Sequence, residues 1–312
     1  MQYVEERIKR LLQELETRIY PIKTPVSGIR MKKTRDQYDP SAGINTTAWE
    51  VCPPEPLWGG HREYFWFSME VDISETFAGM PVEIEVRTGR EEPREKGEEW
   101  GWDALNPQFT AFVNGRIVQG LDINHRDILL TEQAKGGEHF TVVLSAFTGD
   151  QNPTLKLDCR LKARDVITEK YFYDLEVPYK ILRLLERDDK LYLDMVRILN
   201  QSLDFVEFRY PYSAVYTDSI HQADIFLEEN YYQVYQNRSI AKAYCVGHTH
   251  IDVAWKWTLS VTRDKALRSF STVLELMDRY PQYRFMSSQP QLYKYVKEQS
   301  PAQFERIRSR VA

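Results

Sequence analysis

The sequence has few cysteines, no long apolar run and no excess of basic residues, and each absence excludes a class of protein. Its 312 residues include three cysteines, Cys52, Cys159 and Cys245, whose odd number and wide spacing exclude a disulfide framework and favour a reducing compartment. The first ten residues are too highly charged for a secretory signal, and no run approaches the roughly 18 apolar residues of a membrane span. We therefore expect a cytoplasmic protein.

The charge balance restricts the partners. A net charge of -5 and a pI near 5.8 argue against nucleic acid or an anionic membrane as a partner. The composition, 42% hydrophobic and 28% charged, is typical of a globular protein, and the length predicts two or three domains. Aromatic residues make up 13% of the chain, which indicates either bulky core packing or stacking of aromatic rings on sugars.

Residues 1–49 are predicted to form an N-terminal helix and an extended wrap. Apolar residues recur at three- and four-residue steps with charged residues between them, which is the pattern of an amphipathic helix over residues 2–19. Pro21 and Pro25 end this helix, and Gly, Pro and Asn punctuate the polar chain beyond them.

Residues 50–165 are predicted to form an antiparallel β-sandwich, because short runs with a period of two recur and Asn114-Gly115 is typical of a hairpin turn. The loop with Asp122, Asn124 and His125 is predicted to form either a hydrogen-bonded turn or a sugar-binding loop. Together with Trp58-Gly-Gly60, this order resembles the jelly-roll domain that precedes the catalytic domain in some glycosidases. The runs are Tyr64–Val71, Val82–Val86, Gln108–Val113, Phe140–Leu144 and Thr154–Leu161.

Residues 166–240 are predicted to form a helical connector. Leucine, isoleucine, valine and methionine recur there at helical spacing in two groups, which Pro211 separates.

The residues with the clearest chemistry follow the connector. The apolar run Ala243–Val246 predicts a buried strand, and if the backbone stays extended, His248, His250 and Asp252 point to one face. Imidazole and carboxylate groups on one face suit Zn²⁺ or a similar divalent ion. The alternative is a purely structural role for the two histidines.

A helix, a second strand and another helix are predicted after these residues. Ser260 is expected to cap the first helix, Tyr280-Pro281 ends it, and Arg284–Ser288 predicts the second strand. The β-α-β-α order over residues 241–312 is typical of the opening of a parallel α/β domain, in which sites lie at the C-terminal ends of the strands.

Three motifs in this region carry a resemblance: Val246-Gly-His-Thr-His-Ile-Asp-Val-Ala-Trp255, Ser269-Phe-Ser-Thr-Val-Leu-Glu-Leu-Met277 and Ser287-Ser-Gln-Pro-Gln-Leu-Tyr293. They resemble the start of the catalytic domain of class II α-mannosidases, glycoside hydrolase family 38, and are most similar to its cytosolic-type bacterial branch. The resemblance implies that His250 and Asp252 bind zinc and that Trp255 forms the floor of the mannose subsite. His248 is not a ligand in that pattern, so we expect it to support the ligands or to pack beside them.

The resemblance also implies an activity: metal-dependent hydrolysis of terminal α-D-mannose from oligosaccharides with retention of configuration, with Zn²⁺ or Co²⁺ as cofactor. It implies a multidomain α+β protein in which residues 241–312 are the incomplete start of an α/β barrel, and association into a homo-oligomer in the full-length protein. The segment Lys256–Val261 departs from the family, because many relatives carry Pro after the second Trp and Glu near position 261. No residue here is assigned as nucleophile, acid or further ligand, so we expect these beyond residue 312 and the chain to be an inactive N-terminal fragment.

Two other functions remain open at this stage. The sandwich over residues 50–165 would serve a non-catalytic carbohydrate-binding protein. A metal hydrolase of the amidohydrolase type also begins its barrel with His-x-His, but that scheme gives Asp252 and Trp255 no role.

Overall fold

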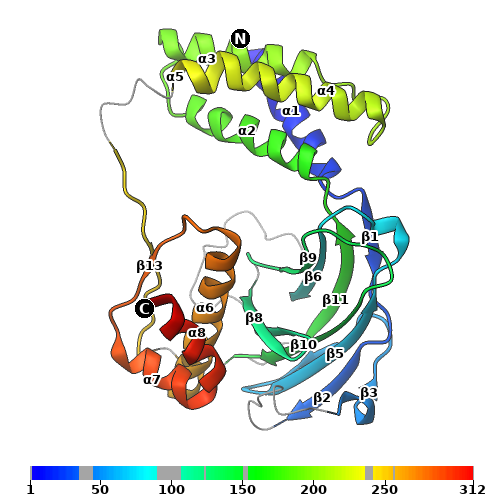
Figure 1. Cartoon of the computed structure of the whole chain (residues 1–312), viewed down its shortest axis with the longest axis vertical. Helices are drawn as coiled ribbons and strands as arrows, with labels where there is room; N and C mark the ends of the chain where they lie inside the picture. The colour runs from blue at the N-terminus through cyan, green and yellow to red at the C-terminus, as the bar shows by residue number, and fades with distance from the viewer. Residues whose placement is uncertain are drawn as a thin grey trace. The chain divides into compact units, whose positions relative to one another are not determined.

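Helices and β-strands form a mixed α+β fold in the computed structural model, which describes residues 2–34, 45–89, 107–122, 124–149, 154–235, 242–255 and 257–311. The chain divides into two compact units. The helical unit comprises residues 1–23, 79–82 and 162–243, and the sheet unit comprises residues 24–78, 83–161 and 244–312. Each unit combines segments that lie far apart in the sequence, as the colours of Figure 1 show. The predicted domain boundaries follow chain order instead, and they stay predictions.

Three predicted features lie outside the described residues: the wrap at residues 35–44, the end of the connector at residues 236–240 together with the first residue of the next domain, and Lys256. Within the part of the chain that the structure describes, no helix is both long and apolar enough to cross a lipid bilayer.

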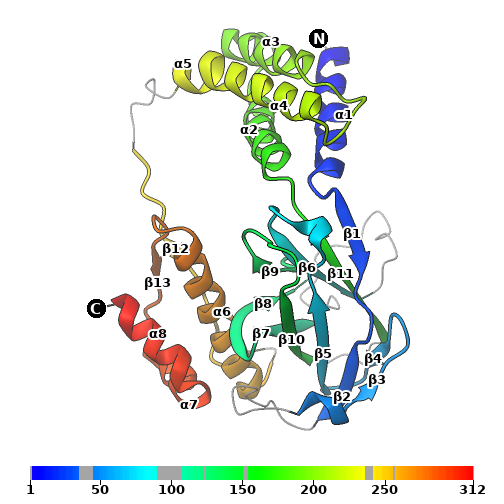
Figure 2. The ribbon, with the colours of Figure 1, turned by 45° about the vertical axis from the view of Figure 1, so that its right-hand side comes forward.

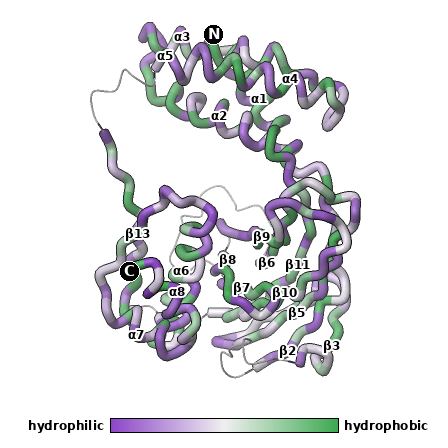
Figure 3. The backbone as a smooth tube through the Cα atoms, viewed as in Figure 1, coloured by the Kyte–Doolittle hydropathy of each residue, from purple (hydrophilic) through white to green (hydrophobic). Residues whose placement is uncertain are grey.

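The helical unit is built around the N-terminal helix. α1 (Gln2–Arg18) confirms the helix predicted from the apolar spacing, and Ile8 and Leu15 on it are fully buried in a core shared with α2 (Val166–Leu182) and α3 (Lys190–Asp204). Figure 3 shows hydrophobic and hydrophilic residues alternating along these helices, as expected of helices with one buried face.

The predicted connector is confirmed as helical and shares its core with α1. α4 (Ala214–Leu227), a π-helical turn (Glu228–Tyr232) and α5 (Gln233–Tyr235) follow α3 in this unit. The starts of α2, α3 and α4 are each capped by a side-chain oxygen that accepts a backbone N–H, from Asp165, Asp189 and Ser213.

Two sheets form the β-structure of the predicted sandwich. All five neighbouring strand pairs of the first sheet run antiparallel. Its strand order is β3 (Glu50–Val51), β2 (Arg30–Thr34), β5 (Tyr64–Asp72), β10 (His139–Phe147), β7 (Gln108–Val113) and β8 (Arg116–Leu121). The second sheet has the order β1 (Ile22–Pro25), β11 (Thr154–Ala163), β6 (Val82–Gly89) and β9 (Asp127–Thr131), and β4 (Leu57–Gly59) also pairs with β11.

Two turns of the first sheet follow from their residue types. Asn114 and Gly115 have φ of 50° and 78°, the left-handed conformation of a tight hairpin turn, and they join β7 to β8 as predicted. After β8, Asp122 Oδ1 accepts from the backbone N of Asn124 at 2.8 Å and of His125 at 2.9 Å. The loop is therefore a hydrogen-bonded turn, the first of its two predicted forms.

The first sheet is buried on both faces, which a period of two does not predict. On one face, Trp58 of β4 lies 5.5 Å from both Phe67 and Phe109, measured between ring centroids, so the two sheets pack face to face. On the other face, Trp66 and Phe112 lie 5.7 Å apart and belong to a core that includes residues of the C-terminal helices. β5 is aromatic at successive positions because each of its faces meets a packed layer.

The C-terminal segment confirms the predicted β-α-β-α order. β12 (Gly247–His248) and β13 (Phe285–Met286) pair in parallel and are joined through α6 (Leu259–Arg279). α7 (Pro290–Gln299) and α8 (Pro301–Val311) follow. A two-stranded sheet does not establish a barrel.

Two details of this segment were predicted wrongly. Ala243–Val246 is irregular and exposed rather than a buried strand, and the strand begins at Gly247. An apolar run becomes a buried strand only where neighbouring strands and helices cover it, and β13 is the sole partner of β12 among the described residues. The N-cap of α6 is Thr258 rather than Ser260, and their two hydroxyl oxygens lie 2.7 Å apart.

α6 lies directly against β8, beside which both Figure 1 and Figure 2 place it. One glycine makes the approach close: Gly120 N donates to Thr272 Oγ1 at 2.9 Å, and a Cβ at Gly120 would lie 2.9 Å from Arg268 Cβ. At the start of β8, Arg116 binds Glu275 through two nitrogen–oxygen contacts of 2.5 and 3.1 Å.

α6 itself carries two charged residues on its buried face. Asp264 and Arg268 are 4% and 9% exposed. Burial raises the pKa of Asp264 to about 6, although the Arg268 charge and hydrogen bonds from Gln299 and Tyr64 oppose the rise. Burial also lowers the pKa of Arg268, whose guanidinium donates to Gln108 on β7.

We expect Gly120→Ala to destabilise the sheet unit. The added methyl must displace the Arg268 stem, and inserting one carbon into a packed contact costs about 1–3 kcal/mol. Urea denaturation followed by tryptophan fluorescence measures the change. An unfolding free energy equal to that of the wild type would show that α6 does not pack this closely on β8.

The pKa of Asp264 predicts a pH-dependent stability. Because the folded chain holds this proton up to about pH 6 and the unfolded carboxyl releases it near 3.8, the stabilisation is complete below 3.8 and is lost as the pH rises through 6. The interval corresponds to about 3 kcal/mol. The unfolding free energy of the wild type, minus that of Asp264→Asn, should therefore fall between about pH 4 and pH 7. A difference that stays constant over this range would contradict the assignment.

Candidate functional site

The predicted metal ligands lie in the loop between β12 and α6. His250 Nε2 and Asp252 Oδ1 are 3.0 Å apart, and the two side chains are 72% and 41% exposed. Ile251 between them is buried, so the backbone alternates here as an extended chain does, although the strand itself ends at His248. His248 is exposed on β12 and is not part of the pair.

The His250–Asp252 pair fits one edge of a tetrahedral metal site. Zn–N and Zn–O bonds of about 2.0–2.1 Å place two ligand atoms roughly 3.3 Å apart, close to the observed separation. A neutral imidazole and an ionised carboxylate are also ligand types that Zn²⁺ and Co²⁺ accept. Among the described residues, no group of three or more His, Cys, Asp or Glu is placed to hold a metal ion, so these residues supply two donors.

Aromatic rings stand beside the pair. Trp255 is 54% exposed and packs edge-to-face on Trp257, with centroids 5.9 Å apart. Lys265 Nζ lies 3.5 Å from the centroid of the Trp257 ring. The pKa of Lys265 is lowered to about 8, mainly by burial and also by the charge of Arg268, while the charge of Asp252 opposes the change.

The backbone of this loop adopts an uncommon conformation. Ala254 has φ of 62°, in the left-handed region that costs a residue with a Cβ about 1 kcal/mol or more. Its N–H is bound by Thr262 Oγ1 at 3.0 Å, and the same hydroxyl accepts from Trp257 Nε1 at 3.0 Å. The predicted site residues are therefore brought together on a loop that a buried threonine of α6 holds.

Sequence reasoning missed Thr262 and Lys265. Thr262 lies one helical turn before Ala266 and two before Phe270, on the buried face of α6. A threonine on that stripe must find hydrogen-bond partners inside the protein, and this was the available signal. The sequence offered no comparable signal for Lys265.

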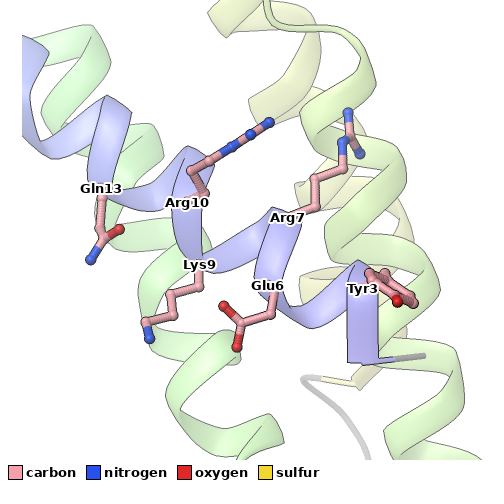
Figure 4. A pocket seen from close by; sticks show the side chains of 6 residues that line it. All are labelled: Tyr3, Glu6, Arg7, Lys9, Arg10 and Gln13. Atoms are coloured by element: carbon pink, nitrogen blue, oxygen red, sulfur yellow. The ribbon is translucent and has the colours of Figure 1, made fainter.

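A shallow hollow lies elsewhere, along α1 in the helical unit (Figure 4). It is lined by polar and charged side chains of that one helix, together with the ring of Tyr3, and these point in several directions. It contains none of the predicted site residues, and Arg7 within it is bound to Asp204 at 2.7 Å. We assign it no role.

Known proteins resemble the chain in the same region. Residues 241–312 match the family described as Glycosyl hydrolases family 38 N-terminal domain. Alpha-mannosidase G of Dictyostelium discoideum is 27% identical over 223 residues, which are 64% of this chain and 20% of that protein. Alpha-mannosidase of Saccharomyces cerevisiae is 39% identical over 85 residues, or 27% and 8% of the two chains. Alpha-mannosidase 2C1 of Homo sapiens is 31% identical over 134 residues, or 43% and 12%.

The chain spans a fifth or less of the length of these three relatives. The segment that matches the family includes β12, α6 and the loop between them, which holds His250, Asp252 and Trp255. Residues 241–312 of this chain therefore carry sequence of the N-terminal domain of glycosyl hydrolases family 38.

Proposed function

We propose that this chain contributes to a metal-dependent, retaining α-mannosidase that releases terminal α-D-mannose from oligosaccharides. The observation that carries the proposal is the 3.0 Å approach of His250 to Asp252 beside an exposed Trp255, all within the segment that matches family 38. The names of the relatives support mannose as the sugar.

In this proposal three side chains have distinct roles. The imidazole of His250 would hold the metal through Nε2 and Asp252 would hold it through its carboxylate, while Trp255 would offer its ring to the apolar face of the mannose. When bound, the metal supplies a Lewis acid that grips sugar hydroxyls. Trp257 packs against the ring of Trp255, and Lys265 lies over the ring of Trp257.

Retention of configuration requires two carboxyl groups about 5–5.5 Å apart, one as nucleophile and one as acid. We assign neither role to a described residue, and two donors leave a tetrahedral metal incomplete. We therefore propose that the 312-residue chain by itself binds metal weakly and does not turn over substrate.

The metal ligands are testable by titration with Co²⁺, whose visible absorption reports the ligand field. His250→Ala and Asp252→Asn should each weaken Co²⁺ affinity at least about tenfold, because each removes one of two donors. A matched control exists in the sandwich, where His125 and Asp122 form a similar exposed pair at 3.1 Å. His125→Ala should leave Co²⁺ affinity unchanged. Equal affinity in all three variants would refute the assignment of the site.

The activity is testable with an aryl α-mannoside. The chain with Zn²⁺ or Co²⁺ should release no more aryl alcohol than buffer with the same metal does. Metal-dependent turnover that disappears in Asp252→Asn would show that the chain already holds a complete site, against this proposal.

The alternative of a carbohydrate-binding sandwich has less support. Trp58 and Trp66 are 3% and 1% exposed, and Phe67 and Phe109 are buried as well, so these large rings of the sheets are committed to packing. If mannose quenches tryptophan fluorescence equally in the wild type and in Trp255→Ala, binding lies outside the proposed subsite and the alternative gains.

A further inference from the structure

We infer that Thr262 is a positioning residue: its single hydroxyl fixes the loop that carries Asp252 and Trp255, and so sets how the metal ligands and the sugar platform face one another. The inference rests on the proposed function for the identity of the ligand. The geometry itself is independent of that function.

The hydroxyl of Thr262 makes three hydrogen bonds to this loop and one longer contact, of 3.5 Å, to the Thr258 carbonyl oxygen at the start of the helix. Thr262 is fully buried in the first turn of α6. Its Oγ1 accepts from the Ala254 backbone N at 3.0 Å and from Trp257 Nε1 at 3.0 Å, and it donates to the carbonyl oxygen of Asp252 at 3.2 Å. A hydroxyl offers one donor and two acceptor sites, so three points of a six-residue loop meet at one atom.

Each of the three bonds restrains something that the site needs. The bond to the Asp252 carbonyl fixes the residue whose carboxylate meets His250. The bond from Ala254 holds a left-handed backbone that an alanine leaves readily unless its surroundings retain it. Because Ala254 directly precedes Trp255, its backbone conformation sets the direction in which the chain enters Trp255.

The third bond acts on Trp255 through its neighbour. Trp257 is held at its indole nitrogen by Thr262 and on one face by Lys265, and Trp255 packs edge-to-face on it. Trp255 N also donates to the Trp257 carbonyl oxygen at 3.3 Å. Loss of the Thr262 hydroxyl therefore frees Trp257 first and Trp255 with it.

Thr262 has a firm support of its own. Its backbone N donates to Thr258 O at 3.1 Å, and α6 is anchored to β8 through Gly120 and Thr272. The first turn of α6 therefore gives the loop a rigid attachment, because the helix that contains it is packed on β8.

The test compares Thr262→Val, which keeps the shape of the side chain and removes the hydroxyl, with Thr262→Ser, which keeps the hydroxyl. Thr272→Val is a matched control, since Thr272 also lies on α6 and accepts a backbone N–H, but from β8. Each variant is measured for Co²⁺ affinity, for the near-ultraviolet circular dichroism of the Trp255–Trp257 pair and for unfolding by urea. Trp255→Phe identifies the dichroism band of the pair.

Thr262→Val should weaken Co²⁺ binding about tenfold, as the loss of a residue supporting a metal ligand does, and should abolish the band of the tryptophan pair. Thr262→Ser should restore both to within about twofold of the wild type. Thr272→Val should lower the urea midpoint but leave the affinity and the band unchanged.

Two results would overturn the inference: a Thr262→Val chain that keeps both the band and the affinity, or a Thr272→Val chain that loses both to the same extent, which would reveal a general loss of structure. If the wild type binds no Co²⁺, the proposed metal site fails on its own account, and the dichroism band still decides whether Thr262 holds the loop.

Discussion

The close packing of α6 on the outer face of the first sheet is the interaction on which the sheet unit depends. Gly120 lets the helix approach β8, Thr272 accepts the glycine N–H, and Trp66 and Phe112 share a core with the helix. The contact covers a sheet face that would otherwise expose large aromatic rings to water. It also buries Asp264 and Arg268. Burial raises the pKa of Asp264 and lowers the pKa of Arg268, so it favours the neutral form of each side chain. The sandwich is thus a foundation for the helix that follows the candidate site.

The site itself shows what one strand end supplies. An extended backbone presents alternate side chains to one side, so His250 and Asp252 face solvent together while Ile251 is buried between them. Two such donors form one edge of a coordination tetrahedron. Sites at the C-terminal ends of parallel strands draw their groups from several strands, so a β12–β13 pair offers the loops of two. His250 and Asp252 are residue types that suit a metal ion. They supply only part of its coordination, because the other groups of such a site come from further strands.

Sequence patterns predicted most of the elements but few of their contacts. Apolar spacing placed α1, and Asn114-Gly115 placed the β7–β8 hairpin, because both signals are local. Ala243–Val246 was wrongly predicted to be a buried strand because burial depends on what covers a segment, which the segment does not encode. The proximity of His250 and Asp252 follows from their spacing, whereas the binding of Thr262 to Ala254 and Trp257 depends on how the loop folds back onto α6. The double burial of β5 did have a local signal, its successive aromatic residues, which the period of two leaves unexplained.

The two-sided burial of the first sheet also has a consequence for synthesis on the ribosome. Trp66, Phe112 and Val143 emerge long before Leu267 and Phe270, which cover them in the finished core. At about 5–20 residues per second, the interval between Val143 and Leu267 lasts on the order of ten seconds. During that time the nascent sandwich carries an uncovered aromatic face, which is the kind of surface that chaperones recognise and that promotes aggregation. The order of residues along the chain therefore leaves this face without its cover until α6 has been synthesised.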